Sequence, residues 1–151
     1  MGYIVDSYEF AKRKKVTVSN RYIDSTLTDQ VTRISFVSDS QVGAICQSNG
    51  NDIRFTTLSG TLLNSKNTFF SLSSGHATAD FLVLVSSLSS SVGTELYMYY
   101  GNATCPEKSN PSAIWPSKYK LSYHFNEASG DILDSTSNAF DAISHGTVSY
   151  R

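Results

Sequence analysis

The feature that most constrains this chain is an alternation of apolar and polar residues with a period of two. It recurs from residue 15 onward in segments of roughly four to eight residues, which Ser, Asn, Asp and Gly separate. One segment places Ile34 and Phe36 on one face and Arg33 and Ser35 on the other. Successive side chains of a strand point to opposite faces, so this pattern is typical of half-buried strands. We therefore expect an all-β chain without substantial helix, with Ile34 and Phe36 in its core.

Two local patterns refine this expectation. Residues 79–85 are apolar on both faces, which is typical of the central strand of a sheet. The short apolar segment 42–46 belongs to the same series, and the dipeptide Asn49-Gly50 after it favours a tight reversal near Gly50. Short strands separated by turns at this spacing predict an antiparallel β-sandwich of jelly-roll type.

The length of 151 residues corresponds to about one domain, but the pattern is not uniform along it. Residues 1–11 precede the first clear strand pattern, and we expect them to form an N-terminal arm or linker. The three prolines of the chain, Pro106, Pro111 and Pro116, fall in a stretch without periodicity, which suggests a boundary. We therefore predict a sandwich module over 12–115, and over 116–151 either extra strands or the start of a second module.

Charge and hydropathy exclude two classes of partner. The chain has 12 Lys and Arg against 13 Asp and Glu, a net charge of -1 and a pI near 6.3, whereas nucleic-acid binding needs clustered cations. The only cationic cluster is residues 12–15. No stretch approaches the ~18 apolar residues that span a bilayer, and the N-terminus has no basic region followed by an apolar one, as a signal peptide would. We expect no nucleic-acid partner, no membrane insertion and no secretion signal.

Catalytic and metal-binding motifs are weak. The acids Glu127, Asp131, Asp134 and Asp141 could offer oxygen ligands to Ca²⁺, but turn acids bonded to nearby backbone are the favoured interpretation. The three histidines lack metal-binding spacing, and with 26 serines a Ser-His-Asp set would occur by chance. No Gly-x-Ser-x-Gly turn is present. We predict no enzyme, no catalytic residues, no metal site and no cofactor.

The sequence also disfavours glycoside hydrolysis and reactive or metal-binding cysteines. A glycoside hydrolase needs two facing carboxylates about 5 to 9.5 Å apart, and no strand carries acids at i and i+2 to supply them. Cys46 and Cys105 match no zinc or redox spacing, so unpaired thiols are expected.

The aromatic residues of segment 94–100 are more informative. Leu96, Met98 and Tyr100 alternate with Tyr97 and Tyr99. If the first set faces the core, the two other tyrosines share the opposite face, where exposed rings can stack on sugars. The alternative is that neighbouring segments cover both faces, as in an ordinary sheet. We predict a ligand site made of Tyr97, Tyr99, Asn102 and Arg54, in which the last two supply hydrogen bonds.

Two blocks of sequence resemble the domain of unknown function 2341 family. The first block is residues 51–56 (Asn-Asp-Ile-Arg-Phe-Thr) with Gly60-Thr61 after it, and the second block is residues 95–103 (Glu-Leu-Tyr-Met-Tyr-Tyr-Gly-Asn-Ala). Residues 14–20 and 27–28 also resemble the family's opening strand, so the likeness covers roughly residues 12 to 115. The resemblance implies a β-sandwich module and carries no catalytic residues over to this chain.

The resemblance also implies a setting. Such modules occur in large surface and adhesive proteins of bacteria and archaea and in phage tail fibres, and a concanavalin-A-like or laminin-G-like lectin domain often follows them. Residues 123–127, Gly130 and 134–138 are similar to the first strands of such a domain. We expect a non-catalytic attachment module at a virion or cell surface that recognises surface carbohydrate. The alternative is a purely structural spacer that contacts other structural subunits or copies of itself.

Overall fold

A computed structural model describes residues 2–108, 113–125 and 127–146 of the chain. Backbone contacts divide the chain into two units, Met1–Asn110 and Pro111–Arg151. Within the described residues, no helix is both long enough and apolar enough to cross a membrane.

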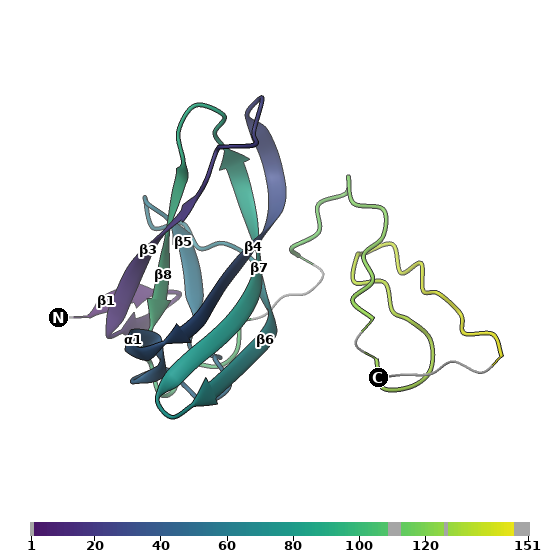
Figure 1. Ribbon diagram of the computed structural model, residues 1–151. Helices are drawn as coiled ribbons and strands as arrows, with labels where there is room; N and C mark the ends of the chain where they lie inside the picture. The colour runs from purple at the N-terminus through teal and green to yellow at the C-terminus, as the bar shows by residue number, and fades with distance from the viewer. Residues whose placement is uncertain (1, 109–112, 126, 147–151) are drawn as a thin grey trace. The chain divides into compact units, whose positions relative to one another are not determined.

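Six strands of the first unit form two antiparallel sheets that face each other (Figure 1). The first sheet has the order β3 (Lys12–Val18), β8 (Thr94–Tyr100) and β5 (Arg54–Thr57), and the second has the order β4 (Leu27–Asp39), β7 (His76–Leu88) and β6 (Ser65–Ser73). The predicted central strand 79–85 is part of β7, which lies between β4 and β6. The expected antiparallel β-sandwich is confirmed.

The main core lies between the two sheets. Phe55 of β5 and Phe81 of β7 meet edge to face, with ring centroids 5.3 Å apart. Ile34 is buried in the same cluster, and Phe36 packs against it partly buried. The inward residues of β8 are Leu96, Met98 and Tyr100, as the alternation predicted. Burial of these faces, which the period-two pattern aligns, is the main force that holds the sheets together.

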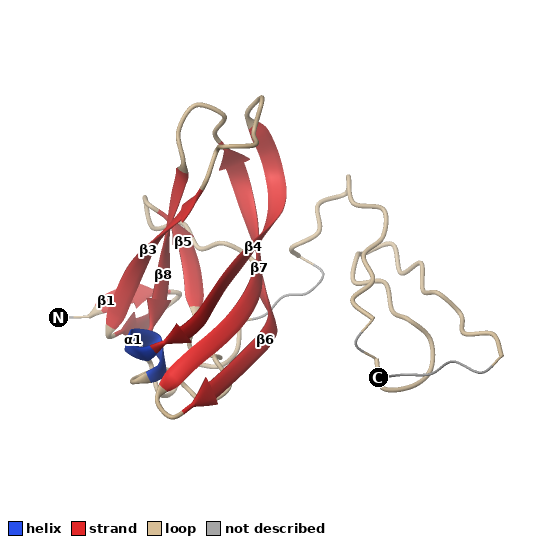
Figure 2. Cartoon of the chain, in the orientation of Figure 1, coloured by secondary structure: helices blue, strands red, loops and turns tan. Residues whose placement is uncertain are grey.

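The segment predicted as part of the strand series near residue 42 is helical instead (Figure 2). Helix α1 (Ser40–Gly43) begins because the Asp39 carboxylate caps it, accepting from the N–H of Gln41 at 3.0 Å and of Val42 at 2.9 Å. Val42 is fully buried in the main core. The reversal expected near Gly50 is present, with a positive φ of 71° that favours glycine.

Residues 1–11, expected as an arm or linker, form part of the first unit. Strands β1 (Tyr3–Val5) and β2 (Tyr8–Phe10) pair as a hairpin across Asp6 and Ser7, which both have positive φ. Two consecutive positive φ values match the twist of a two-residue hairpin turn. Phe10 is fully buried and Val5 is 7% exposed, because both pack on the outer face of the first sheet. The hairpin therefore adds a third layer.

The second unit has little regular structure among its described residues (Figure 2). Its described residues form two isolated bridges, Tyr123 with Asp134 and Ile132 with Ala142. Ile114 is fully buried, and the Trp115 ring packs against Tyr119 at 5.2 Å. Several large apolar side chains of this unit are exposed: Leu121, Phe125, Leu133, Phe140 and Ile143.

Candidate functional site

The predicted site residues Tyr97, Tyr99 and Arg54 share the outer face of the first sheet. Tyr99 on β8 pairs directly with Arg54 on β5. The hairpin covers this face: Tyr99 is only 4% exposed, and its ring lies 5.8 Å from that of Tyr3 and 6.2 Å from that of Phe10. The period-two pattern assigned the tyrosines to the correct face, but the hairpin covers that face at Tyr99, and Tyr97 is half-buried.

The remaining part of this face is occupied by a cation. The Arg13 guanidinium lies 3.9 Å from the centre of the Tyr97 ring and 4.6 Å from that of Tyr3. It also donates to the Tyr99 hydroxyl at 3.5 Å, and this hydrogen bond raises the pKa of Arg13 above its ordinary value. A sugar stacked on Tyr97 would compete with this cation–π contact. The structure therefore does not present Tyr97 and Tyr99 as a free stacking platform.

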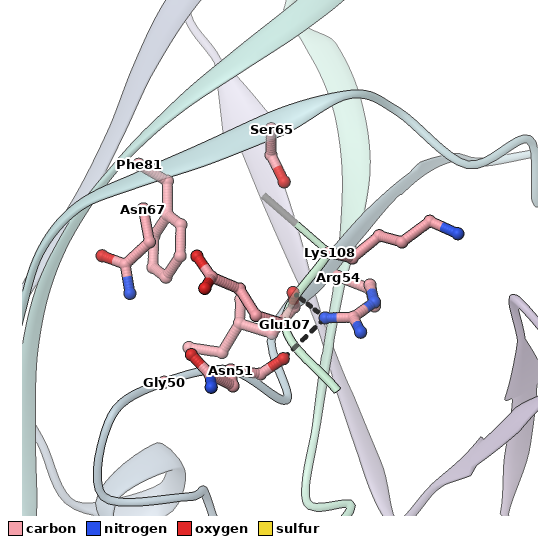
Figure 3. A pocket seen from close by; sticks show the side chains of 9 residues that line it. Gly50, Asn51, Arg54, Ser65, Asn67, Phe81, Glu107 and Lys108 are labelled. Carbon is pink, nitrogen blue, oxygen red and sulfur yellow. Dashed lines mark hydrogen bonds between the residues drawn. The ribbon is translucent and has the colours of Figure 1, made fainter. Parts of the chain in front are cut away.

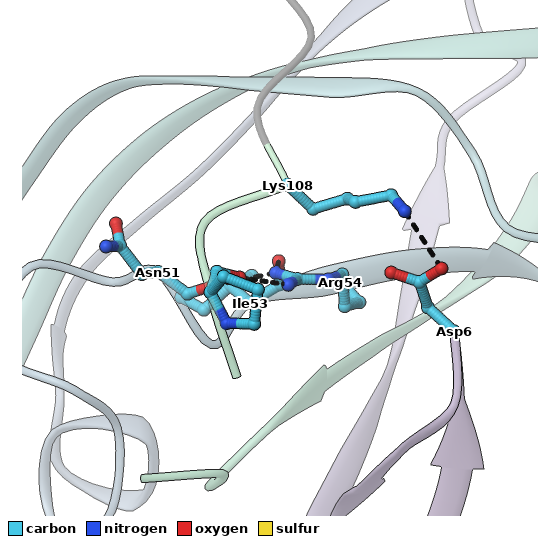
Figure 4. Close-up of polar contacts among 6 residues, drawn as sticks. Asp6, Asn51, Ile53, Arg54 and Lys108 are labelled. Atoms are coloured by element: carbon cyan, nitrogen blue, oxygen red, sulfur yellow. Dashed lines mark hydrogen bonds and ion pairs between the residues drawn. The ribbon is translucent and has the colours of Figure 1, made fainter. Parts of the chain in front are cut away.

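Arg54 is buried beneath the hairpin with 2% exposure. One guanidinium nitrogen donates to the carbonyls of Asn51 at 2.7 Å and Ile53 at 3.0 Å, and the other donates to the carbonyl of Pro106 (Figure 4). The Phe10 ring lies 5.9 Å from the guanidinium carbon. Nearby, Lys108 pairs with Asp6 at 2.9 Å. Arg54 therefore joins the start of β5 to the segment after β8.

Asp52 is the residue that the sequence prediction missed. It is fully buried, and its carboxylate accepts three backbone N–H groups: from Gln47 at 2.9 Å, Gly101 at 2.8 Å and Asn102 at 3.1 Å. These oriented donors take the place of the water that burial removes from the side chain. The available signal was its period-two relation to Arg54, which placed both residues on the face opposite Ile53 and Phe55.

Asn102, the fourth predicted site residue, is also engaged inside the fold. Its side-chain oxygen accepts from the N–H of Thr104 at 2.8 Å and of Cys105 at 2.7 Å, and its amide nitrogen donates to the carbonyl of Glu9 at 2.9 Å. The first block and the second block are thus tied to each other through Asp52 and to the hairpin through Asn102. Residues that resemble the family's signature therefore tie the loops around the first sheet to the hairpin.

Hollows of very different size lie among the described residues of the first unit. A cavity of about 10 Å³ is lined by Arg54, Asn67, Glu107 and Lys108 among others (Figure 3). It has room for about one water molecule. An open cleft of about 460 Å³ lies between β3 and α1, and its lining residues are Lys12, Arg13, Lys14, Gln41, Ala44, Ile45 and Tyr100. Hollows of about 460, 350 and 300 Å³ fall in the size range of small-ligand sites, and the cleft between β3 and α1 is the largest of these three.

Lys14, which lines this cleft, contacts the carboxylate of Asp39. Burial acts to raise the pKa of Asp39, but the Lys14 ammonium and the N–H groups of Val42 and Gln41 lower it below its ordinary value. Lys14 forms an ion pair with this carboxylate. The charge of Lys14 is therefore largely neutralised by the protein itself.

Both cysteines are free thiols. Burial, followed by the charge of Asp52, raises the pKa of Cys46 to about 11, and burial also raises the pKa of Cys105. At pH 8 about 0.1% of Cys46 is then thiolate, which is the reactive form. We predict that Ellman's reagent modifies the native chain about a hundredfold more slowly than the chain in denaturant. Equal rates in the two conditions would contradict the buried environment.

The acids expected to serve as turn residues include Asp134, which organises the second unit. Its carboxylate accepts from the N–H of Ser122 at 2.8 Å, of Thr136 at 2.9 Å and of Phe140 at 3.1 Å, and from the Thr136 hydroxyl at 2.8 Å. Burial acts to raise the pKa of Asp134, but these donors outweigh it and lower the pKa to about 2. Within the described ranges, no three His, Cys, Asp or Glu side chains gather as metal ligands.

A lowered pKa predicts a definite pH dependence. Asp134 stabilises the second unit fully above its unfolded pKa of about 4, and this contribution is lost as the pH falls towards 2. The single tryptophan, Trp115, lies in this unit and reports on it by fluorescence. We predict a fluorescence change between pH 4 and pH 2 that is absent in Asp134→Ala. The exposed Asp24→Ala serves as the control and should keep the change.

Comparison with known proteins gives a family. The family described as "Domain of unknown function (DUF2341)" matches residues 49–142, which is more than half of the chain. The match includes both blocks and continues into the second unit. Searches of curated proteins and of solved structures found no match. The chain belongs to the domain of unknown function 2341 family.

Proposed function

We propose that the chain is a non-catalytic attachment module of a phage tail appendage or cell-surface adhesin, and that it recognises surface carbohydrate. The observation that carries this proposal is the open cleft of about 460 Å³ between β3 and α1. Its volume lies within the range of small-ligand pockets. The cleft is built on strand and helix elements whose backbone is held by the main core, which favours a preformed site.

The internal use of the signature residues supports the same proposal. Asp52 and Arg54 are 0% and 2% exposed, so they maintain the scaffold and do not contact a ligand. A rigid scaffold with recognition at a separate surface cleft suits an attachment module that acts in many copies. Weak binding at each cleft would be raised by repetition on the particle or cell.

A glycan array probed with the intact chain, made multivalent on streptavidin, tests this function. We expect saturable binding that is lost in Ala44→Trp, since Ala44 is an exposed cleft residue and the larger ring would fill the space. Ser91→Trp adds the same ring at an exposed loop position and is the matched control. Absence of binding to every glycan contradicts the function, and equal binding by Ala44→Trp contradicts the use of this cleft.

A structural role in assembly is the second candidate, and the second unit favours it. Phe125 is 72% exposed and Ile143 is 68% exposed, and large exposed apolar groups often mark contact surfaces. We propose copies of the same chain as the partner in this case. In the alternative proposal, further strands of a lectin-like module cover Phe125 and Ile143.

Sedimentation velocity over a range of concentrations tests the assembly role. We expect the intact chain to self-associate and Phe125→Ser with Ile143→Ser to shift it towards the monomer. A monomer at all concentrations contradicts this role. Point substitutions are used rather than deletion of the hairpin at residues 1–11, because Phe10 is fully buried and its loss would disturb the fold.

A further inference from the structure

Two of the described cations that line the cleft between β3 and α1 form no ion pair, and one of them, Arg13, is held by the Tyr99 hydroxyl and by the Tyr97 and Tyr3 rings. Lys14 is held by Asp39, and Lys15 pairs with Glu95 at 3.1 Å. Lys12 is exposed, lines the cleft and takes part in none of the ion pairs formed by the described residues. Its ammonium is therefore available to an anion that enters the cleft.

The other walls supply different chemistry. The Gln41 side chain is exposed at the start of α1, and among the described residues it has no hydrogen-bonding partner. Ala44 and Ile45 follow the helix with exposed apolar surface, and Ile45 is 41% exposed. Tyr100 of β8 completes the lining. A cation, an amide and an apolar surface thus converge on one open space.

We propose that this cleft binds an anionic sugar residue, with a carboxylate or sulfate group on Lys12. The Gln41 amide would bond the ring hydroxyls, and the apolar face of the sugar would lie on Ile45. Lys12 and an acid in this setting form a partly exposed charge pair, whose attraction weakens with salt. This inference rests on the proposed function and names the class of glycan that the module takes.

The competing explanation for Lys12 is protection of a sheet edge. β3 is the outer strand of its sheet, and lysines on edge strands hinder pairing with other chains. Edge protection would apply equally to Lys15, whose side chain points to the opposite face of β3 and does not line the cleft. The two lysines therefore separate the explanations.

The intact chain and its variants are titrated calorimetrically with four probes: a tetragalacturonate, a heparin-derived sulfated tetrasaccharide, the neutral cellotetraose and a tetraglutamate peptide. We expect at least one anionic sugar to bind and cellotetraose to bind at least tenfold more weakly. Lys12→Glu should weaken that binding by about tenfold or more, which corresponds to about 1.4 kcal/mol. Gln41→Ala should weaken it a few-fold, and Lys15→Gln should remain within twofold of the unmodified chain.

Each outcome has one meaning. Binding of either anionic sugar that Lys12→Glu and added salt both weaken supports the inference, and the two sugars together show whether carboxylate or sulfate is preferred. Equal binding of cellotetraose and the anionic sugars, unchanged in Lys12→Glu, overturns the inference and leaves the proposed function standing. Binding of tetraglutamate alone points to an acidic protein partner and overturns the inference. If no glycan of any kind binds here or on the array, the proposed function itself fails.

Discussion

Asp52→Ala is expected to lower the free energy of unfolding by about 4 kcal/mol, since it leaves three backbone N–H groups of half-buried residues without an acceptor. These are the N–H groups of Gln47, Gly101 and Asn102, which meet at a fully buried carboxylate. Asp52→Asn should also destabilise the fold. Both oxygens of the aspartate accept from backbone N–H groups, and the asparagine side chain would direct its own N–H groups at one of these donors. Urea unfolding followed by circular dichroism measures both effects.

Asp24→Ala is the matched control for Asp52. Asp24 is exposed, so its loss should change the free energy of unfolding by no more than about 0.5 kcal/mol. If Asp52→Ala unfolds at the same urea concentration as Asp24→Ala, the carboxylate does not link the two blocks. If Asp52→Asn is as stable as the unmodified chain, acceptor atoms on both sides of the side chain are not needed.

Phe10→Ala is expected to cost about 3 to 5 kcal/mol, the usual range for removing a buried phenylalanine. Phe10 is the last residue of the hairpin strand β2. It is fully buried against the first sheet, where it contacts the Tyr99 and Arg54 side chains. Its loss should release the hairpin and expose Tyr99. Hydrogen exchange of the β1 and β2 amides measures that release directly, beside the change in urea midpoint.

Phe69→Ala provides the comparison, because Phe69 is 51% exposed on the outer strand β6. We expect a cost below about 1 kcal/mol there. If Phe10→Ala and Phe69→Ala were equally stable, residues 1–11 would be a detachable arm after all. Faster exchange confined to the hairpin, with an unchanged midpoint, would show that the third layer is not coupled to the sandwich.

The sequence pattern was informative wherever one strand face met the main core. It placed Ile34 in the interior, residues 79–85 in a central strand, and Leu96, Met98 and Tyr100 on the inward side of β8. These predictions succeeded because burial of an apolar face is a local property of a strand with period two. The apolar segment 42–46 is not a strand: α1, which the Asp39 carboxylate caps, ends at Gly43, and residues 44–46 form a turn.

The candidate site could not be derived in the same way. Period two separated Tyr97 and Tyr99 from the core residues, but it could not show what lies on their face. The answer comes from residues 3–10, more than eighty positions away in the sequence, whose short hairpin has no long alternation of its own. Arg54 and Asn102 stand near aromatic residues in the predicted site, but both bond to backbone groups, which include the distant carbonyls of Pro106 and Glu9.

The sequence by itself determined the class of structure, namely two sheets of alternating strands around an apolar core, because that pattern depends on each strand alone. The tertiary structure decided which surfaces are free, because exposure depends on segments that meet only in the folded chain. It placed the family's signature residues inside a three-layered scaffold and left Lys12 and Gln41 open at a cleft between β3 and α1. Local periodicity was therefore enough to predict the sandwich, whereas the open cleft depends on long-range packing.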